Sequence, residues 1–279
     1  SNGVSIAQPL HFAFHQIYGR GENTKEEFEE FKKRYESGEF QEDIDKYMKK
    51  NKPIIVIGDA CLDIWTYTEE PIRFAPEAPV PIVTRSHSIQ NVGMSGNVLE
   101  NIKSLGKECE LISNDNWEKI QKERFLDEKT NYIHLRVDIF DTASPITNLN
   151  LIDYNKYSAV VISDYNKGSL SEKDIKYISE QHPLTFLDTK KQLGQWCKKV
   201  TFIKINRKEY NLSKQFLKPT IEKKIIITLG SEGCVYRQKT YPVKEVEVKN
   251  LAGAGDTFLA ALVSNFVETN NIEKALTFA

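Results

Sequence analysis

After residue 53 the chain alternates short apolar runs with longer polar stretches, and this alternation predicts its fold. The runs are rich in β-branched residues and lie at 54–57, 159–162, 185–187, 202–205 and 225–228. Continuous apolar strands of this kind are typical of a parallel sheet that is buried on both faces. The pattern therefore favours an α/β fold with a doubly wound, mostly parallel sheet.

Polar or glycine residues follow each of these runs. They are Gly58-Asp59, Ser163-Asp164, Asp188-Thr189, Asn206-Arg207 and Gly230-Ser231. Because the carboxyl ends of parallel strands meet at one edge of a sheet, we expect the chemistry of the protein at that edge.

Two extended segments, 78–84 and 132–137, do not fit the strand–helix rhythm. We expect them to belong to a small separate β sheet that projects as a lid over the site, with lid strands at about 72–92 and 130–138.

The first 52 residues differ from the rest. Thr24 and Glu27 have the spacing of a capping box, and apolar residues at helical spacing follow them. These residues are Phe28, Phe31, Tyr35, Ile44, Tyr47 and Met48. We predict a charged helical arm or linker over 1–52 and one larger domain over 53–279.

The composition excludes several classes of function. With 38 Lys and Arg against 39 Asp and Glu, the formal charge is −1, so neither nucleic acid nor an anionic membrane is an expected partner. No apolar run approaches the ~18 residues that span a bilayer. The four cysteines are far apart and form no C-x-x-C pair, which favours a reducing, cytoplasmic setting. The start at Ser1 shows no secretory signal, and we expect the interior of a longer chain.

The most specific motif is a glycine turn that runs into an apolar helix, Gly253-Ala254-Gly255-Asp256. Backbone N–H groups at such a helix start favour a phosphate or a developing oxyanion. Asp256 could there take a proton from a substrate hydroxyl. A plain turn with Asp256 as a helix cap is the alternative.

Several motifs together resemble the ribokinase-like (PfkB) carbohydrate kinase family. Residues 253–258 resemble its C-terminal signature, and 93–98 resemble its N-terminal glycine motif. Within the family, the chain is most similar to the kinase domain of bifunctional heptose-phosphate kinase/nucleotidylyltransferases. That similarity rests on Gly58-Asp59, Leu62-Asp63 and the segments 76–81, 163–168 and 188–190. The resemblance implies a ribokinase-like sugar kinase domain over 53–279.

The resemblance also implies roles for single residues. Asp256 matches the catalytic base, with the amides of Ala254, Gly255 and Asp256 as its anion hole, and Gly253 belongs to the same catalytic motif. ATP would be bound by Lys190, Asn206, Glu209, Thr228, Gly230 and Gly233. Glu209 would hold Mg²⁺ through water, because this ion sheds its water reluctantly. For Lys190 an ordinary surface lysine, and for the glycine loop a plain turn, remain alternatives.

On the acceptor side the implied residues are Asp59, Asp63, Gly93, Asn97, Arg136 and Lys167. The two aspartates could accept hydrogen bonds from sugar hydroxyls, although a helix cap would explain one of them. Arg136 and Lys167 could bind a phosphate already on the sugar. The alternative for Arg136 is a pair with Asp138, two residues further on.

The chain departs from the family pattern at several points. Met94 stands where the family has glycine, Asn250 and Ala252 stand where Asp and Thr are common near a monovalent-cation site, and the chain is short between 115 and 122. It also stops at residue 279, where relatives continue.

The predicted function is ATP-dependent phosphorylation of a sugar or sugar phosphate, with a heptose 7-phosphate favoured, as in an ADP-heptose type pathway. The alternative is a non-catalytic, sugar- or nucleotide-binding or scaffolding half of a bifunctional protein. Expected partners are the sugar, a second copy bound through the lid strands, and an upstream nucleotidylyltransferase domain, whose H-x-G-H signature does not occur in these residues.

Overall fold

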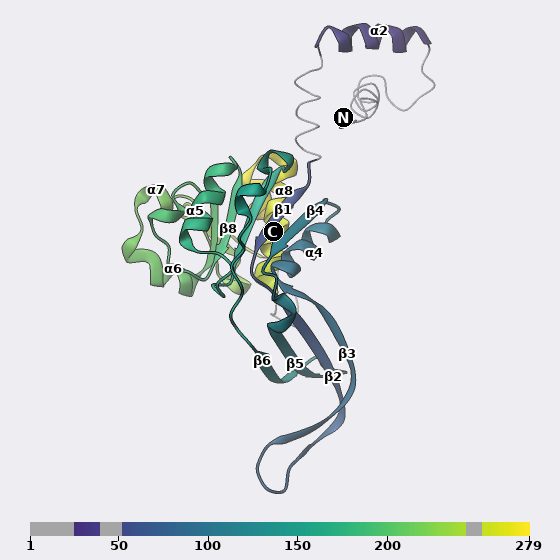
Figure 1. The fold of residues 1–279 in the computed structure, drawn as a ribbon, viewed down its shortest axis with the longest axis vertical. Coiled ribbons are helices and arrows are strands. Elements are labelled where there is room, and N and C mark those ends of the chain that lie inside the picture. Colours follow the sequence, from purple (N-terminus) through teal and green to yellow (C-terminus); the bar gives the residue numbers. More distant parts are fainter. Residues whose placement is uncertain (1–24, 40–51, 244–252) are drawn as a thin grey trace. The chain divides into compact units, whose positions relative to one another are not determined.

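The computed structural model of the chain describes residues 25–39, 52–243 and 253–279 (Figure 1). By its internal contacts the chain divides into two compact units, 1–52 and 53–279. Of the first unit, the structure describes helix α2 (Lys25–Glu36), in which the rings of Phe31 and Tyr35 lie 6.1 Å apart. Thr24 of the predicted capping box and the second predicted apolar stripe, 44–48, lie outside the described residues.

The second unit is built on an eight-stranded sheet in the order β12-β11-β10-β9-β8-β7-β1-β4. The strands are β1 (Ile54–Gly58), β4 (Cys109–Ser113), β7 (Ala159–Asp164), β8 (Thr185–Thr189), β9 (Phe202–Asn206), β10 (Ile225–Thr228), β11 (Cys234–Tyr236) and β12 (Lys239–Tyr241). All neighbours from β10 to β4 are parallel, and β11 and β12 form an antiparallel edge. The five predicted apolar runs are all strands of this sheet, and the predicted α/β class is confirmed.

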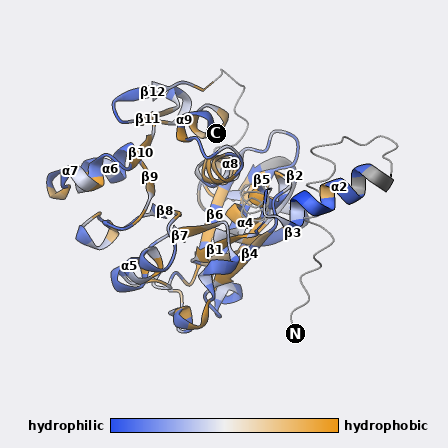
Figure 2. Ribbon diagram, turned by 90° about the horizontal axis from the view of Figure 1, so that it is seen from above, coloured by the Kyte–Doolittle hydropathy of each residue, from blue (hydrophilic) through white to orange (hydrophobic). Residues whose placement is uncertain are grey.

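Helices cover both faces of this sheet. Figure 2 shows α5 (Glu172–Gln181), α6 (Arg207–Ser213) and α7 (Pro219–Glu222) on one side of the strands. On the other side lie α4 (Ser95–Ser104), α8 (Ala254–Thr269) and α9 (Ile272–Phe278). Alternate residues of the buried strands feed two separate apolar cores, one under each helix layer. This explains why the strands are apolar at every position rather than at every second one.

Short 3₁₀ turns connect several of these elements. They lie at Trp117–Lys119, Leu149–Leu151, Tyr154–Lys156, Gln195–Cys197, Lys214–Phe216 and Gly230–Glu232. None of the helices in the described part of the chain has the length and apolar character needed to cross a bilayer.

A second sheet of four strands forms the lid, in the order β3-β2-β5-β6. Its strands are β2 (Ala60–Phe74), β3 (Pro81–Met94), β5 (Gln121–Asp127) and β6 (Ile133–Ile139). In Figure 1 the β2–β3 hairpin extends well beyond β5 and β6. The lid begins earlier than the sequence pattern suggested, because β2 starts two residues after β1 ends, and β5 was not anticipated.

The two faces of the lid differ in character because side chains alternate along each strand. The cross-strand pairs Asp63–Lys122, Lys122–Asp138 and Arg124–Arg136 place charged residues on one face, here called the charged face. The pairs Phe125–Leu135, Glu123–Val137 and Gln121–Ile139 place apolar β6 residues on the opposite, apolar face.

Met94, at the junction of β3 and α4, has a backbone conformation that normally belongs to glycine. Its φ is 57° and its ψ −118°. Its side chain is buried and packs in a cluster with Cys61, Ile120 and Ala143, with Tyr165 against it. The packing of the side chain therefore offsets a strained backbone.

We expect Met94→Ala to destabilise the protein more than Met94→Gly does, by about 1 kcal/mol. Both changes remove the packed side chain, which costs about 2–5 kcal/mol, but only glycine relieves the strain. Urea unfolding of the three proteins measures the difference. An alanine variant as stable as the glycine variant, or more stable, would show that the backbone at this position is not strained.

Candidate active site

Asp256 lies in the first turn of α8, at the edge of the sheet where the parallel strands end. Gly253, with a left-handed φ of 81°, makes the turn that precedes the helix and is itself the N-cap residue. Gly253 rather than Asp256 is the N-cap, and no side chain in the described part of the chain caps this helix end, so the structure does not support the alternative that Asp256 is a cap. The Asp256 side chain is buried, with 4% of its surface exposed.

Two neutral donors contact the Asp256 carboxylate. The hydroxyl of Tyr165, in the loop after β7, donates to Oδ1 at 2.5 Å. The amide of Asn97, in the first turn of α4, donates to Oδ2 at 3.4 Å. Burial raises the pKa of Asp256 above its usual range and nearby Asp188 adds to this, while the Tyr165 hydrogen bond opposes it. The arrangement gives a carboxylate with a high affinity for a proton.

A buried ion pair lies close to the start of α8. Lys204 Nζ, on β9, is 2.6 Å from Oδ2 of Asp188, on β8. A side chain on Gly255 would place its Cβ 2.8 Å from the same ammonium group. Glycine at 255 therefore lets a positive charge sit against the helix start. The other oxygen of Asp188, Oδ1, is buried and has no hydrogen-bond partner among the described residues.

The predicted ATP-side residues Lys190, Asn206 and Glu209 lie together at the ends of β8 and β9. Asn206 Oδ1 accepts from the Glu209 backbone N–H, and Glu209 Oε2 accepts from that of Asn206, so the Asn-x-x-Glu motif is a capping box for α6. Lys190 Nζ contacts Glu209 Oε1 at 2.6 Å. Burial opposes the charge of Lys190, but Asp188 and Glu209 together raise its pKa, so the ammonium form persists.

The glycine loop lies at the end of β10, as expected from the strand pattern. Thr228 is the last residue of that strand. Gly230 and Gly233 have φ values of 63° and 88°, and a side chain on Gly233 would collide with the carbonyl of Tyr241. The loop is a tight glycine-dependent turn beside Asn206, since Thr228 and Asn206 are register partners.

The residues present are compatible with an outer-sphere magnesium ion. Within the described ranges, no three His, Cys, Asp or Glu side chains form a ready metal cage. Both Glu209 oxygens already accept protein donors, whereas Asp188 Oδ1 is free. A Mg²⁺ ion here would take most of its ligands from phosphates and water, which is its common habit.

On the acceptor side, Asp63 is buried at the base of the lid. Its Oδ1 accepts from Arg124 Nη1 at 3.1 Å, and the Cys61 thiol lies 3.7 Å away. A side chain on Gly93 would collide with the Asp63 carboxylate, so the glycine leaves room for it. Asn97, Asp63 and Gly93 thus lie around one end of the lid.

Asp59 has a different task from the one expected. It is fully buried, and its carboxylate accepts the backbone N–H groups of Tyr165, Lys167 and Ser169 at 2.7, 3.1 and 3.1 Å. We expected it to accept hydrogen bonds from sugar hydroxyls, but the structure uses it to hold the loop after β7.

Arg136 and Lys167, the predicted phosphate ligands, belong to one charge cluster. Arg136 makes two hydrogen bonds to Asp138, at 2.7 and 2.8 Å, which is the alternative that the sequence left open. Lys167 pairs with Asp141. Lys122 joins these pairs, since its Nζ lies 3.4 Å from Asp138 and 3.6 Å from Asp141.

Four residues of this site were missed by sequence reasoning. They are Tyr165, Lys204, Lys122 and Arg124. Tyr165 stood inside a quoted motif, directly after a strand end, and that position was the available signal. The other three carried no local signal, because their partners are distant in the sequence. Asn250 and Ala252, discussed for a monovalent cation, lie outside the described residues.

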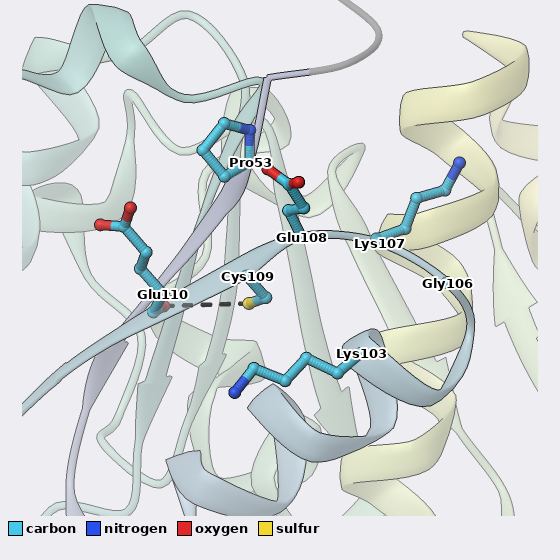
Figure 3. A pocket seen from close by; sticks show the side chains of 7 residues that line it. All are labelled: Pro53, Lys103, Gly106, Lys107, Glu108, Cys109 and Glu110. Carbon is cyan, nitrogen blue, oxygen red and sulfur yellow. Dashed lines mark hydrogen bonds between the residues drawn. The ribbon is translucent and has the colours of Figure 1, made fainter.

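A separate pocket lies at the opposite, amino-terminal edge of the sheet (Figure 3). It is lined by Pro53, Lys103, Gly106, Lys107, Glu108, Cys109 and Glu110. Lys107 pairs with Glu268 at 3.2 Å, and the Cys109 thiol points to the Glu110 carbonyl. This pocket is not part of the site around Asp256.

Comparison with known proteins agrees with this geometry. Residues 173–279 match the model of the pfkB family carbohydrate kinases. Ribokinase from Thermotoga maritima covers 81% of this chain, with a TM-score of 0.60 and 17% identity over 89% of that structure. Phosphofructokinase-2 from Escherichia coli covers 81% of the chain, with a TM-score of 0.59 and 13% identity over 89% of its own length. The fold is therefore that of ribokinase and phosphofructokinase-2, and residues 173–279 are similar to the pfkB family of carbohydrate kinases.

Curated relatives include the bifunctional protein HldE of Helicobacter pylori strain J99, which is 29% identical over 82% of this chain. The bifunctional protein HldE of Nitratiruptor sp. is 25% identical over 81%. The chain spans about three fifths of the length of these relatives, 61% and 59%.

Proposed function

We propose that this kinase phosphorylates a sugar that already carries a phosphate, with a heptose 7-phosphate as the favoured acceptor and ATP as the donor. The observation that carries the proposal is a buried carboxylate, Asp256, at a helix start beside a lid face with clustered cations. The buried carboxylate would supply the base for phosphoryl transfer, and the clustered cations would bind the phosphate of the acceptor.

The transfer follows from the positions of the groups. Asp256 accepts the proton of the acceptor hydroxyl as its oxygen attacks the terminal phosphorus of ATP, and the bond to the bridging oxygen breaks to release ADP. The first N–H groups of α8 have no partner within the helix and point at the transferred phosphoryl group, whose charge they stabilise. Lys190 offers a second positive charge. Mg²⁺, when bound, neutralises phosphate charge, and Glu209 would orient its water.

The acceptor phosphate would bind at the charge cluster of Lys122, Arg124, Arg136 and Lys167. These cations are partnered by three carboxylates, Asp63, Asp138 and Asp141, which leaves an excess of one positive charge. Lys122 is buried between two carboxylates and is the most confined of the four. A phosphate replaces carboxylate oxygens as acceptor for such donors.

The relatives support a second domain beside the kinase. Their printed name describes a bifunctional protein, and they are longer than this chain. We propose that a nucleotidylyltransferase domain precedes the kinase in the same polypeptide and that the protein acts in the cytoplasm. The alternative, a non-catalytic binding or scaffolding half, predicts no ADP release when sugar is added.

Asp256→Asn is expected to lower kcat by roughly 10² to 10⁴, the range for a positioned proton acceptor. Asparagine keeps the shape and can accept the Tyr165 hydrogen bond at its single carbonyl oxygen, and it loses only the weak 3.4 Å contact from Asn97, so folding and ATP affinity should remain nearly unchanged. Steady-state ADP release and nucleotide titration calorimetry measure the two effects.

The matched control for this variant is Asp174→Asn, because Asp174 occupies the same first-turn position in α5, away from the site. It should turn over like the parent protein. Turnover of Asp256→Asn within threefold of the parent would refute the catalytic role of Asp256, whereas a parent protein that releases no ADP when sugar is added would favour the non-catalytic alternative.

Lys122→Gln is expected to raise the KM for heptose 7-phosphate by roughly 10-fold or more, because it removes a charge-assisted hydrogen bond. The KM for unphosphorylated heptose and for ATP should change little. Lys239→Gln, which removes an exposed lysine paired with Glu273, is the control. An equal change for both sugars would place the phosphate elsewhere.

We also propose that a second copy of the chain covers the apolar face of the lid. Leu135, Val137 and Ile139 are 52%, 37% and 41% exposed there, on adjacent same-face positions of β6. Three exposed apolar side chains in a row are an unfavourable surface for a single chain in water, and burial in a dimer removes it.

Light scattering should therefore give the mass of two chains for the parent protein and of one chain for Leu135→Asp. Leu151→Asp is the control, since Leu151 is 75% exposed outside the lid. A monomeric parent protein, or a dimer that Leu135→Asp leaves intact, would refute the proposed interface.

A further inference from the structure

The two oxygens of the Asp256 carboxylate are not equivalent. Oδ1 accepts a hydrogen bond of 2.5 Å from the Tyr165 hydroxyl, which is short for this pair of groups. Among the described residues, Oδ2 accepts only a 3.4 Å contact from Asn97, whose own Oδ1 accepts from Asn91 at 3.2 Å. An incoming sugar hydroxyl can therefore displace the weak contact at Oδ2, while Oδ1 stays held.

Tyr165 is itself fixed from several sides. Its backbone N–H donates to Asp59 Oδ2 at 2.7 Å. Its side chain packs against the cluster that contains Cys61 and Met94. The residue before it, Asp164, is buried and accepts from Thr189 Oγ1 at 2.5 Å and from Lys191 Nζ at 2.6 Å. The phenol is thus placed before any substrate arrives.

We propose that Tyr165 is a positioning residue for the general base: its hydroxyl holds Oδ1 of Asp256, so that Oδ2 faces the acceptor and the carboxylate stays ionised in a buried site. The proposal rests on the assignment of Asp256 as the base. It gives Tyr165 a task in catalysis without contact with the reacting atoms.

The charges around Asp256 show why such a donor is needed. Asp188, on β8, disfavours the ionised form, as does burial itself. Lys204 on β9, Asn97 on α4 and Tyr165 favour it. Two further charged groups lie near this site. Asp63 on the lid is a neighbour of Tyr165, and Glu209 on α6 is a neighbour of Lys190.

The direction of the pH effect follows from these contributions. The Tyr165 hydrogen bond lowers the pKa of Asp256, so its removal raises that pKa further. A base with a higher pKa is protonated, and therefore inactive, up to a higher pH. Burial also raises the pKa of the Tyr165 phenol well above its usual value, so the group remains a donor at neutral pH.

The test is Tyr165→Phe, which keeps the ring and removes the donor. We expect kcat to fall about 10- to 100-fold, the effect of losing a hydrogen bond to a charged group. The acid limb of the kcat–pH profile should move to higher pH, and the KM for ATP should stay within about twofold of the parent value.

Tyr157→Phe is the matched control. Tyr157 lies before the start of β7, and its hydroxyl donates to Glu110 Oε2 at 2.6 Å, so the same kind of bond is lost far from the site. Its kinetics and pH profile should equal those of the parent protein. Thermal unfolding of both variants checks that they fold.

Site-specific replacement of Tyr165 by 3-fluorotyrosine is a second measurement that depends less on folding. This residue is a slightly larger, stronger acid and a better donor, so the acid limb should move to lower pH. An acid limb that moves in neither variant, or a kcat of Tyr165→Phe within twofold of the parent, overturns the proposal. If the Asp256→Asn variant retains turnover, the assignment of Asp256 as the base is wrong. If Asp256→Asn is inactive but Tyr165→Phe behaves like the parent protein, only the positioning role of Tyr165 is wrong.

Discussion

The hydrogen bonds of one buried carboxylate, Asp59, hold the site together. Its side chain accepts three backbone N–H groups from the loop after β7, and its backbone carbonyl accepts the N–H of Ser95 at the start of α4. That loop carries Tyr165 to Asp256 and Lys167 to the charge cluster, and α4 carries Asn97. A carboxylate that satisfies several backbone donors is costly to replace, because each donor would be left unpaired in a buried place.

The partners of the buried carboxylates set Asp256 apart from the others. Asp63, Asp164 and Asp188 each pair with a cation, whose charge balances that of the carboxylate. Asp256, by contrast, is contacted by neutral donors, with Asp188 nearby to disfavour its charge. Environment rather than residue type thus separates the ion-paired carboxylates from Asp256, the proposed base.

The sequence predicted those parts of the fold that depend on local pattern. Apolar runs marked the buried strands, and the residues after them marked the edge where Lys190, Asn206 and Asp256 meet. The spacing of Asn206 and Glu209 also fits the capping box that the structure shows, but the pair was interpreted only as an ATP and Mg²⁺ motif. The task of Asp59 and the roles of Lys122 and Arg124 could not be predicted from the sequence. They depend on which distant strands pair with one another, and a one-residue change in register would place these side chains on the other face.

In the charge cluster of the lid, the cations that could bind a phosphate are already held by ion pairs with aspartates. Each of its cations has an aspartate partner before substrate binds, so a phosphate must exchange with a carboxylate rather than meet a bare charge. A phosphate that replaces a carboxylate binds less tightly than one that meets an unpaired lysine, because the loss of the existing ion pair offsets part of the energy of the new ion pair. In return, each cation is already oriented and a stray anion gains little. In the proposed function, an acceptor that also reached Asp63 and Asp256 with its hydroxyls would gain from all three places at once, so the cluster would favour a phosphorylated sugar over a free phosphate.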